Sequence, residues 1–434
     1  MGLDKIRFFF QISSWVFPYL FSVLNQRIWA NIHRYTYKPL PASQLKSVVV
    51  VGGSFAGFQL AQRLSRTLPT GWRVTLVEKN SHLNYLFAFP RFCVLRGYEK
   101  WAFIPYMGLG KGAPEGIIER RQDDVVAVKK NRLVLKSGKK LEYEYLVIAT
   151  GTSFAPPSKV VSTSHTGGQK EFQDMQQKIQ DAKRIAVIGG GGVGSQMASD
   201  IKDAYRDKDV ALIHSRDRLM HTFGKRLGAY TLARMQELGV RVFLNSRPSM
   251  PADRKGVMNL HGKEETFDLI IPCTSKQPNS SILSTLSPSS ISPSTSRILV
   301  RPTLQVLDPK LPHIFALGDV AETQGPKMAR AANFQAEVIV QNVLSLVKGQ
   351  TAQKVYKPNM AFEGAIKMTL GLRQVVMYSQ SDNGTETLTV NDNYPVDIGI
   401  KRQWGMFGAS VEGMEGDEKK GRRTDAYFVE TKRP

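Results

Sequence analysis

Cysteine is nearly absent from this sequence, and its scarcity excludes several kinds of site. The 434 residues include two cysteines, Cys93 and Cys273, which lie far apart in the chain. Two isolated thiols cannot build a disulfide framework, a zinc finger or a CxxC redox pair. If the chain carries out redox chemistry, its electrons have no protein dithiol to pass through and must go directly to an external acceptor.

Acidic residues are also few relative to basic ones. Asp and Glu number 37 against 59 Lys and Arg, so the formal net charge is +22 and the sequence pI is near 9.9. Such an excess attracts nucleic acid, anionic lipid or a phosphorylated cofactor, and charge alone does not choose among them. Hydrophobic residues make up 42% of the chain, which at this length predicts a folded protein of two or three domains.

Long apolar runs are missing, with one partial exception near the N-terminus. Residues 8–24 (FFFQISSWVFPYLFSVL) contain no charge and are flanked by basic residues, namely Lys5, Arg7, Arg27, Arg34 and Lys38. The run is shorter than the roughly 20 apolar residues of a spanning helix, and it contains Pro18. We interpret residues 1–40 as a membrane-associated segment that keeps the catalytic domain on the cytoplasmic face. A mitochondrial presequence and a helix packed on the catalytic domain are the alternatives.

Two strand–turn–helix–strand units follow this segment. The first reads VVVVGG, AGFQLAQRL and RVTLVE from Ser47, and the second reads RIAVIGG, VGSQMASDI and DVALIH from Arg184. Alternating units of this kind predict parallel sheets with helices packed on their faces. The predicted fold class is therefore α/β, with two Rossmann-like dinucleotide-binding domains.

The first glycine-rich turn joins a strand to a helix and predicts a dinucleotide site. Its residues are Gly52, Gly53, Ser54, Phe55, Ala56 and Gly57. Gly52 permits the tight turn and Gly57 lets the helix pack close to the strand, so the bare helix N-terminus can face a pyrophosphate. Glu78 ends the next strand, where a carboxylate would bind a ribose diol. Ser54 replaces the middle glycine of the usual pattern and narrows the approach to the phosphates.

The second glycine-rich turn repeats this pattern with a different partner. Its residues are Gly189, Gly190, Gly191, Gly192, Val193 and Gly194, and the following strand ends in His214-Ser215-Arg216 instead of an acid. An acid there favours the 2′-hydroxyl of NAD, whereas a nearby arginine accepts the 2′-phosphate of NADP. We therefore expect NADPH to be used at least as well as NADH. The alternative is that Arg216 is an ordinary exposed arginine.

Two further strands end in residues that suit a two-site flavoprotein. The segment YLVIATG ends in the turn Thr150-Gly151, and HIFALGD delivers Asp319 at its C-terminal end. A lone acid that ends an apolar strand needs a partner if it is buried.

These signals divide the chain into segments. We expect an FAD-binding domain built from residues 47–155 and 297–350, an NAD(P)H-binding domain over 156–285, and a small α+β domain with a tail over 351–434. The Ser- and Pro-rich stretch from 275 to 296 is interpreted as a surface loop with no reason to pack.

The ordered motifs GGSFAG, Glu78, YLVIATG, GGGGVG and IFALGDVA resemble the pyridine nucleotide-disulfide oxidoreductase superfamily. Within it, the chain is most similar to apoptosis-inducing-factor-like proteins, in particular the AMID branch, which includes the ferroptosis-suppressing coenzyme Q reductase. The likeness runs from about Ser47 to Lys357. It implies a flavoprotein that holds FAD and takes hydride from NADPH or NADH.

The resemblance also implies roles for single residues. FAD would lie along Gly52 to Ala56, and NAD(P)H along Gly190 to Gly194. The remaining FAD contacts would be Glu78 near the adenosine ribose, Arg91 reaching the cofactor, Val125 at the adenine, Asp319 on the ribitol and Lys327, the catalytic candidate, near the flavin ring. Gln196 stands where the family commonly has Glu, which removes a charge near the expected nicotinamide.

The acceptor of the electrons is the least determined part of this prediction. The missing dithiol, the aromatic N-terminal segment and the family likeness favour a quinone at a membrane surface. A soluble small molecule in a biosynthetic pathway is an alternative. A third hypothesis is a DNA-binding cell-death protein, although any nucleic-acid affinity of so basic a chain would be largely electrostatic and unselective. A homodimer is compatible with the sequence.

Overall fold

The computed structural model describes residues 28–274 and 277–419, together with isolated positions near the N-terminus, namely Ile6, Ser13, Phe17, Phe21, Leu24 and Gln26. Most of the apolar run 8–24 therefore lies outside the described residues, as do residues 420–434 of the predicted tail. The predicted N-terminal apolar helix accordingly stays a prediction over that run. Among the described residues, none of the helices combines the length and apolar character that crossing a bilayer requires.

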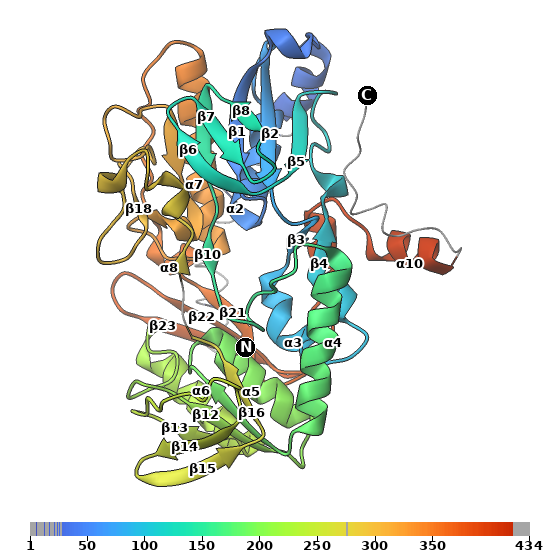
Figure 1. The fold of residues 1–434 in the computed structure, drawn as a ribbon, viewed down its shortest axis with the longest axis vertical. Coiled ribbons are helices and arrows are strands. Elements are labelled where there is room, and N and C mark those ends of the chain that lie inside the picture. Colours follow the sequence, from blue (N-terminus) through green and yellow to red (C-terminus); the bar gives the residue numbers. More distant parts are fainter. Residues whose placement is uncertain are drawn as a thin grey trace.

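The first sheet forms the upper half of the molecule in Figure 1. Its strand order is β19-β9-β1-β2-β5, and all neighbouring strands are parallel. The strands are β1 (Lys46–Val51), β2 (Trp72–Glu78), β5 (Ile118–Gln122), β9 (Tyr145–Ile148) and β19 (Ile314–Ala316). The run VVVV of β1 is buried because a central parallel strand is covered on both faces. Helices α2 (Phe55–Ser65) and α7 (Ala329–Val347) pack against each other beside this sheet.

Smaller strand pairs and short helices lie around the first sheet and between it and the second half of the molecule, where α3 (Phe89–Phe92) contacts α5 (Gly192–Ala204). The strands are β3 (His82–Asn84) with β4 (Phe103–Pro105), the meander β6 (Val125–Lys129), β7 (Arg132–Leu135) and β8 (Lys140–Glu142), β10 (Thr152–Ser153) with β17 (Gln277–Pro278), and β18 (Ile298–Leu299) with β20 (Ala321–Glu322). Among the short helices are η2 (Leu86–Ala88), α3 (Phe89–Phe92), η3 (Glu99–Ala102), η4 (Tyr106–Gly108) and η7 (Gly318–Val320). β19 follows the strands of the second sheet in sequence but pairs with β9, so the chain leaves the first sheet and returns to it.

The second sheet repeats the parallel arrangement in the lower half of Figure 1. Its order is β13-β12-β11-β16, with strands β11 (Arg184–Ile188), β12 (Asp209–Ile213), β13 (Arg241–Phe243) and β16 (Leu269–Pro272). The helices of this half are α4 (His165–Asp181), α5 (Gly192–Ala204) and α6 (Lys225–Leu238), and a hairpin joins β14 (Gly256–Leu260) to β15 (Lys263–Phe267).

The C-terminal part is an antiparallel meander with short helices. It contains α8 (Met360–Glu363), β21 (Ile366–Thr369), β22 (Val375–Gln380), β23 (Glu386–Asn391), α9 (Ile400–Met406) and α10 (Val411–Lys419). Trp404 of α9 is fully buried, and its indole N–H donates to the carbonyl oxygen of Trp101 at 3.0 Å. This hydrogen bond joins α9 of the C-terminal part to η3, the short helix that contains Trp101.

The mixed α/β architecture with two parallel sheets confirms the predicted fold class. The prediction for the Ser- and Pro-rich stretch 275–296 is wrong, because this stretch contains the short helices η5 (Ser281–Leu283) and η6 (Pro288–Ser290) and several buried residues. Leu283 is fully buried and Ser290 is 1% exposed. Serine hydroxyls in this stretch donate to nearby carbonyl oxygens or carboxylates, which lets a polar segment pack without unsatisfied groups.

Candidate functional site

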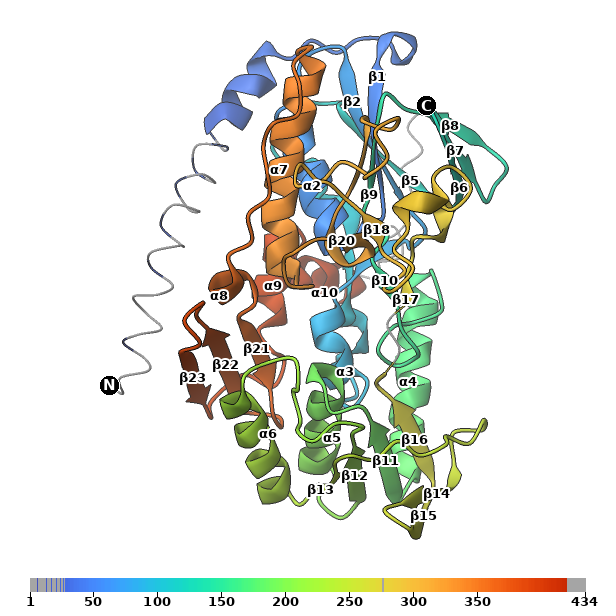
Figure 2. The ribbon, with the colours of Figure 1, turned by 90° about the vertical axis from the view of Figure 1, so that its left-hand side faces the viewer.

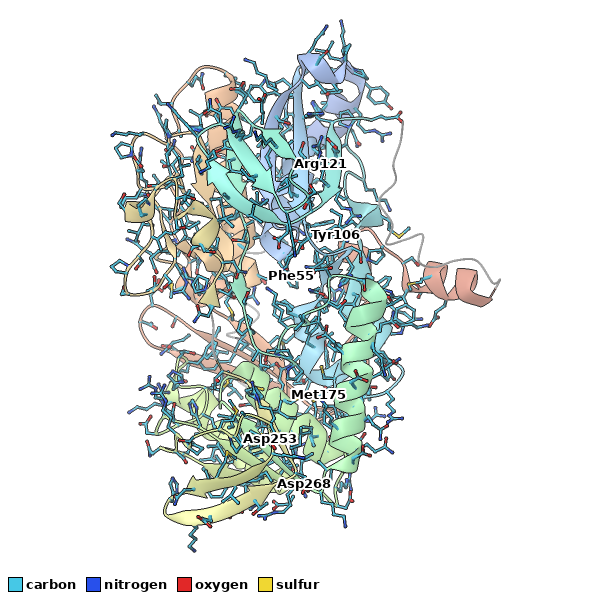
Figure 3. The ribbon with its side chains drawn as sticks, in the orientation of Figure 1. Phe55, Tyr106, Arg121, Met175, Asp253 and Asp268 are labelled. Atoms are coloured by element: carbon cyan, nitrogen blue, oxygen red, sulfur yellow. The ribbon has the colours of Figure 1, made fainter. Side chains whose placement is uncertain are left out.

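A cavity of about 470 Å³ lies where the carboxyl ends of the first sheet's strands meet the start of α2. It brings together many of the residues that the sequence predicted, namely Gly52, Ser54, Phe55, Ala56, Glu78, Val125, Thr150, Gly151, Asp319 and Lys327. In parallel sheets, ligands bind outside the carboxyl ends of the strands. Figure 3 places Phe55 and Tyr106, both lining residues, between the two halves of the molecule.

The first glycine turn leaves no room for side chains at its ends. Gly52 has φ +99°, and a Cβ there would lie 2.4 Å from the carbonyl oxygen of Ala149. A Cβ on Gly57 would lie 1.8 Å from the Gly52 carbonyl oxygen. Gly53 and Gly57 do not line the cavity; they shape the turn and bring α2 against the strand. The N-terminus of α2, with Ser54 at its N-cap, therefore opens into the cavity.

Glu78 is held against this turn from the end of β2. Its Oε2 accepts the backbone N–H of Gly53 at 2.5 Å, and its Oε1 accepts the backbone and side-chain N–H groups of Asn80 at 2.9 and 2.7 Å. The side chain is 7% exposed. These bonds fix the orientation of the carboxylate, so it enters the cavity as a preorganised acceptor.

Two lysines that line the cavity have different surroundings. Lys327 Nζ donates to the carbonyl oxygens of Ala321 and Thr323 at 2.9 and 3.3 Å and to the Thr323 hydroxyl at 3.1 Å. Lys159 Nζ donates to the carbonyl oxygen of Thr152 at 2.7 Å, its one hydrogen bond among the described residues. Burial, and next the charge of Lys79, lower the pKa of Lys159. An ammonium group has three donors, so Lys159 retains more capacity for a ligand than Lys327 does.

The sequence reasoning did not find Lys159 or several other lining residues, namely Lys79, Asn80, His82, Asn84, Phe87, Tyr106, Phe154, Asn279 and Met328. Lys159 follows the Thr150–Gly151 turn, and Asn279 comes from the stretch we had interpreted as a surface loop. Neither sits in a motif. The one signal for Lys159 in the sequence was its position shortly after a predicted glycine turn. Asn279 directly follows β17, which pairs with β10 after that turn, and this pairing could not be read from the sequence.

His82 is the buried histidine of the cavity wall. Its Nδ1 and Nε2 lie 3.0 Å from Ser81 Oγ and 2.9 Å from Asn84 Oδ1. Burial, followed by the neighbouring His165, lowers the pKa of His82 to about 3. The imidazole is therefore neutral at physiological pH and acts as a fixed hydrogen-bonding part of the wall.

The structure does not bring Arg91 to the cavity. The guanidinium group is 2% exposed and makes a bidentate ion pair with Asp200 of α5. Its remaining N–H groups donate to the carbonyl oxygens of Gly371, Leu372 and Val396. All five N–H donors of the guanidinium group are thereby used. The predicted contact of Arg91 with FAD does not fit this placement, and we assign the residue to the junction of three segments instead.

The second glycine turn has the same backbone form as the first. Gly189 has φ +122°, and a Cβ on Gly194 would lie 1.8 Å from the Gly189 carbonyl oxygen. Gly191 is the N-cap of α5, which begins at Gly192. The backbone N–H of Gly190 donates to His214 Nδ1 at 3.1 Å, so His214 takes the structural place that Glu78 has in the first turn. Burial, followed by the charges of His221 and Arg216, lowers the pKa of His214.

The other predicted residues of this turn lie on its rim. Val193 is half-buried on the first turn of α5. Gln196 Nε2 donates to Thr369 Oγ1 of β21 at 3.1 Å, which joins α5 to the C-terminal meander. Arg216 is exposed beyond the end of β12, where a side chain can reach a ligand seated on the turn.

Neither cysteine of the sequence lines the cavity. Burial raises the pKa of Cys93, and it raises the pKa of Cys273 to about 12. Thiols whose pKa is raised in this way stay protonated, and a protonated thiol is a poor nucleophile. Among the described residues, no cluster of His, Cys, Asp and Glu suits a metal ion.

Comparison with protein families assigns residues 46–336 to the family described as pyridine nucleotide-disulphide oxidoreductase. The match covers both glycine turns and Asp319. The chain belongs to this family. It is an FAD-dependent NAD(P)H oxidoreductase, and FAD and NAD(P)H are its cofactors. The first glycine turn fits these groups, because a Cβ at Gly52 or Gly57 would clash with the backbone of Ala149 or of Gly52 and disrupt the turn that presents the N-terminus of α2 to a pyrophosphate.

The chain is also similar to individual members of the family. It is 34% identical to Fe-regulated protein 8 of Mycosarcoma maydis over 408 residues, which cover 86% of this chain and 98% of that protein. It is 31% identical to human ferroptosis suppressor protein 1 over 327 residues, covering 72% and 83% of the two chains. The resemblance stated from the sequence motifs is confirmed.

Solved structures share the fold. The sulfide:quinone oxidoreductase of Aquifex aeolicus matches with a TM-score of 0.65 at 16% identity, covering 87% of this chain and 92% of that chain. A ferredoxin reductase of Rhodopseudomonas palustris matches with a TM-score of 0.59 at 22% identity, covering 77% and 82%.

Proposed function

We propose that this protein transfers reducing equivalents from NAD(P)H through FAD to a quinone at a membrane surface. The observation that carries the proposal is the convergence of the first glycine turn, Glu78 and Asp319 on one cavity that also has an aromatic, partly exposed wall. FAD supplies the hydride-accepting chemistry, and the chain supplies binding, orientation and electrostatics.

The residues that line the cavity can be assigned to the parts of FAD. The α2 N-terminus and the turn Gly52–Ala56 hold the diphosphate, Glu78 accepts hydrogen bonds from the adenosine ribose, and Val125 contacts the adenine. Asp319, together with Thr150 and Gly151, holds the ribitol side, while Lys327 stays near the ring as the catalytic candidate. Lys159, which lines the same cavity, adds a cation for the diphosphate.

The NAD(P)H contacts involve the second turn. Residues Gly190–Gly194 and the N-terminus of α5 receive the pyrophosphate. Arg216 pairs with the 2′-phosphate of NADPH, and Gln196 lies near the nicotinamide. The uncharged amide of Gln196 is held by Thr369, so no carboxylate is present at that position.

The acceptor approaches along aromatic rings. Phe87 lines the cavity and is 51% exposed, and its ring centroid lies 5.1 Å from that of Phe55. Phe407, at the end of α9, lies 5.8 Å from Phe55 and closes the cluster from the C-terminal part. A flat apolar ring such as a quinone can stack on such a surface. The absence of cysteine from the cavity wall fits direct transfer to an outside acceptor.

Two resemblances support a quinone as the acceptor. The name of the Aquifex aeolicus structure, sulfide:quinone oxidoreductase, includes a quinone, and the sequence resembles the branch with the coenzyme Q reductase. We propose that the enzyme is membrane-associated, with the catalytic domain on the cytoplasmic face.

The test is steady-state turnover with NADPH and either a short-chain quinone or ferricyanide, which accepts electrons without needing an apolar surface. Phe87→Ala should raise the KM for the quinone about tenfold, as loss of one stacked ring costs about 1–3 kcal/mol, and leave ferricyanide turnover unchanged. Met107→Ala, at a side chain that is 53% exposed and outside the cavity wall, is the control. Rapid oxygen reduction with no quinone turnover would contradict the proposal and favour a soluble acceptor.

A further inference from the structure

The helix at residues 28–36 has two opposite faces, and only one of them is covered. It lies beside α7 at one end of the first sheet, as Figure 2 shows. Ala30 is 4% exposed and Tyr37, just after the helix, is 7% exposed. Tyr35 is 92% exposed and Ile28 52%.

The covered face is fixed to the body by specific bonds. His33 Nε2 lies 2.7 Å from the carbonyl oxygen of Leu68, and the Tyr37 hydroxyl donates to the carbonyl oxygen of Trp72 at 3.2 Å. Gln26 Nε2 donates to Glu337 Oε2 of α7 at 2.6 Å. The helix therefore has one orientation relative to the FAD-binding half of the molecule.

The other face is an apolar stripe. Its members on this helix are Ile28, Ile32 and Tyr35, and the singly described positions Phe17, Phe21 and Leu24 continue the spacing of three or four residues; all six side chains are 46–92% exposed. We call this set the outer stripe. Since each residue turns a helix by about 100°, positions two apart lie on opposite sides. The fixed positions 26, 30, 33 and 37 are each two residues from a stripe position, so the outer stripe points directly away from the body.

The surroundings of the outer stripe match a lipid surface. Trp29, at 60% exposed, lies on one flank, and Arg34 and Lys38 are exposed beside the stripe. Aromatic rings and basic side chains bordering an apolar face are typical of helices that lie in a membrane interface. The net charge of +22 adds attraction to anionic headgroups. Figure 2 shows α8, which carries the 48% exposed Met360, further along the same side of the molecule.

We infer that the outer stripe docks the enzyme onto an anionic lipid surface, with the helix lying in the plane of the membrane. This inference rests on the proposed function, because it names the surface through which a membrane-acting reductase meets lipid. It also defines an orientation. Because the hydrogen bonds of His33 and Tyr37 hold the helix against the catalytic domain, a helix that lies in the membrane plane sets how the whole domain faces the membrane.

The experiment is co-sedimentation of the full-length protein with vesicles of phosphatidylcholine, with and without phosphatidylserine. The triple variant Ile28→Ser/Ile32→Ser/Tyr35→Ser should lower the partition coefficient on anionic vesicles at least about tenfold. The matched control Val126→Ser/Val161→Ser/Val257→Ser removes three other side chains that are at least half exposed and should bind as the unchanged protein does.

Three results would overturn the inference. The first is equal vesicle binding by the stripe variant and the unchanged protein, and the second is an equal loss of binding in the control. The third is a dimer in vesicle-free solution that the stripe variant dissociates, since the outer stripe would then be an interface between two copies. Turnover with a water-soluble quinone in the absence of vesicles tests the proposed function separately, and it should be the same in all three proteins.

A labelled variant covers the case in which the triple substitution disturbs folding. Tyr35→Cys introduces one exposed thiol into a chain whose other cysteines are buried or half-buried, and an environment-sensitive probe on it should shift to the blue with anionic vesicles. The same probe on Thr70→Cys, exposed near the covered face, should not shift. Equal spectra at the two positions with vesicles present would contradict the inference.

Discussion

Arg91 and Asp200 form a buried bidentate pair, with Nε and Nη2 of the arginine 2.8 and 2.9 Å from the two carboxylate oxygens. The pair joins α3 of the first half to α5 of the second, and the same guanidinium group binds carbonyl oxygens of the C-terminal part. Three parts of the molecule that lie far apart in sequence are therefore joined by one side chain.

The first prediction concerns this pair. Arg91→Met should lower the free energy of unfolding by about 3–5 kcal/mol, because it leaves the buried Asp200 carboxylate without its partner. The double variant Arg91→Met/Asp200→Leu should recover a substantial part of that loss. Chemical denaturation of the purified proteins measures both. Loss of FAD with unchanged stability would instead restore the cofactor role that the sequence suggested for Arg91.

The second prediction concerns Lys159. Lys159→Met should weaken FAD binding to the apoprotein about 10- to 100-fold, as expected for loss of a charge-assisted hydrogen bond to a phosphate. Lys327→Met should weaken it less, because the Lys327 ammonium group is held by Ala321 and Thr323. Flavin fluorescence titration measures the affinity without any turnover. Equal losses in the two variants would contradict the assignment of the diphosphate to Lys159.

The lowered pKa of Lys159 sets the sign of a pH effect. The group is charged below its pKa and neutral above it, so a lowered pKa means that the charge is lost at a lower pH than for an ordinary lysine. FAD affinity of the unchanged protein should fall as the pH rises into the alkaline range. Lys159→Arg, which stays charged, should flatten this fall.

The third prediction concerns coenzyme choice. Arg216→Ala should raise the KM for NADPH about tenfold, the cost of one lost arginine–phosphate contact at a partly exposed site, and leave the KM for NADH unchanged. Lys263→Ala, an exposed substitution on β15, is the control for a general loss of positive charge. A hundredfold preference of the unchanged enzyme for NADH would refute the role of Arg216.

The fourth prediction follows from His82, whose pKa falls from 6.5 to about 3 on folding. Between these values the unfolded chain takes up a proton and the folded chain does not. Stability from this group is therefore present above pH 6.5 and is lost as the pH falls toward 3, by up to roughly 1.4 kcal/mol per pH unit. His82→Gln should reduce the acid dependence of the free energy of unfolding over this window, measured by chemical denaturation at several pH values.

Much of the site could be predicted because the residues that form its turns are consecutive in the sequence. The turn at Gly52 needs a positive φ and a bare backbone, and those requirements show in the sequence as glycines between a strand and a helix. Asp319 and Thr150 were found for the same reason, since each ends a buried strand of the same sheet. Parallel strands bring their carboxyl ends to one edge, so residues far apart in sequence meet there.

The rest of the site depends on contacts that no local pattern encodes. Lys159 and Asn279 reach the cavity because β10 pairs with β17, a long-range antiparallel contact between two very short strands. Arg91 was misplaced because a lone arginine carries no sign of its partner, and Asp200 lies 109 residues away. The Ser- and Pro-rich stretch was misread because its buried hydroxyls are satisfied by neighbours in three dimensions.

The most direct test of the electron path is a pair of half-reactions followed by visible absorbance in the absence of oxygen. Addition of NADPH to the purified holoenzyme should bleach the flavin, and a following stoichiometric addition of a short-chain quinone should restore the absorbance within the turnover time. A flavin that NADPH bleaches but that the quinone leaves bleached, while admitted air restores it, would contradict the account.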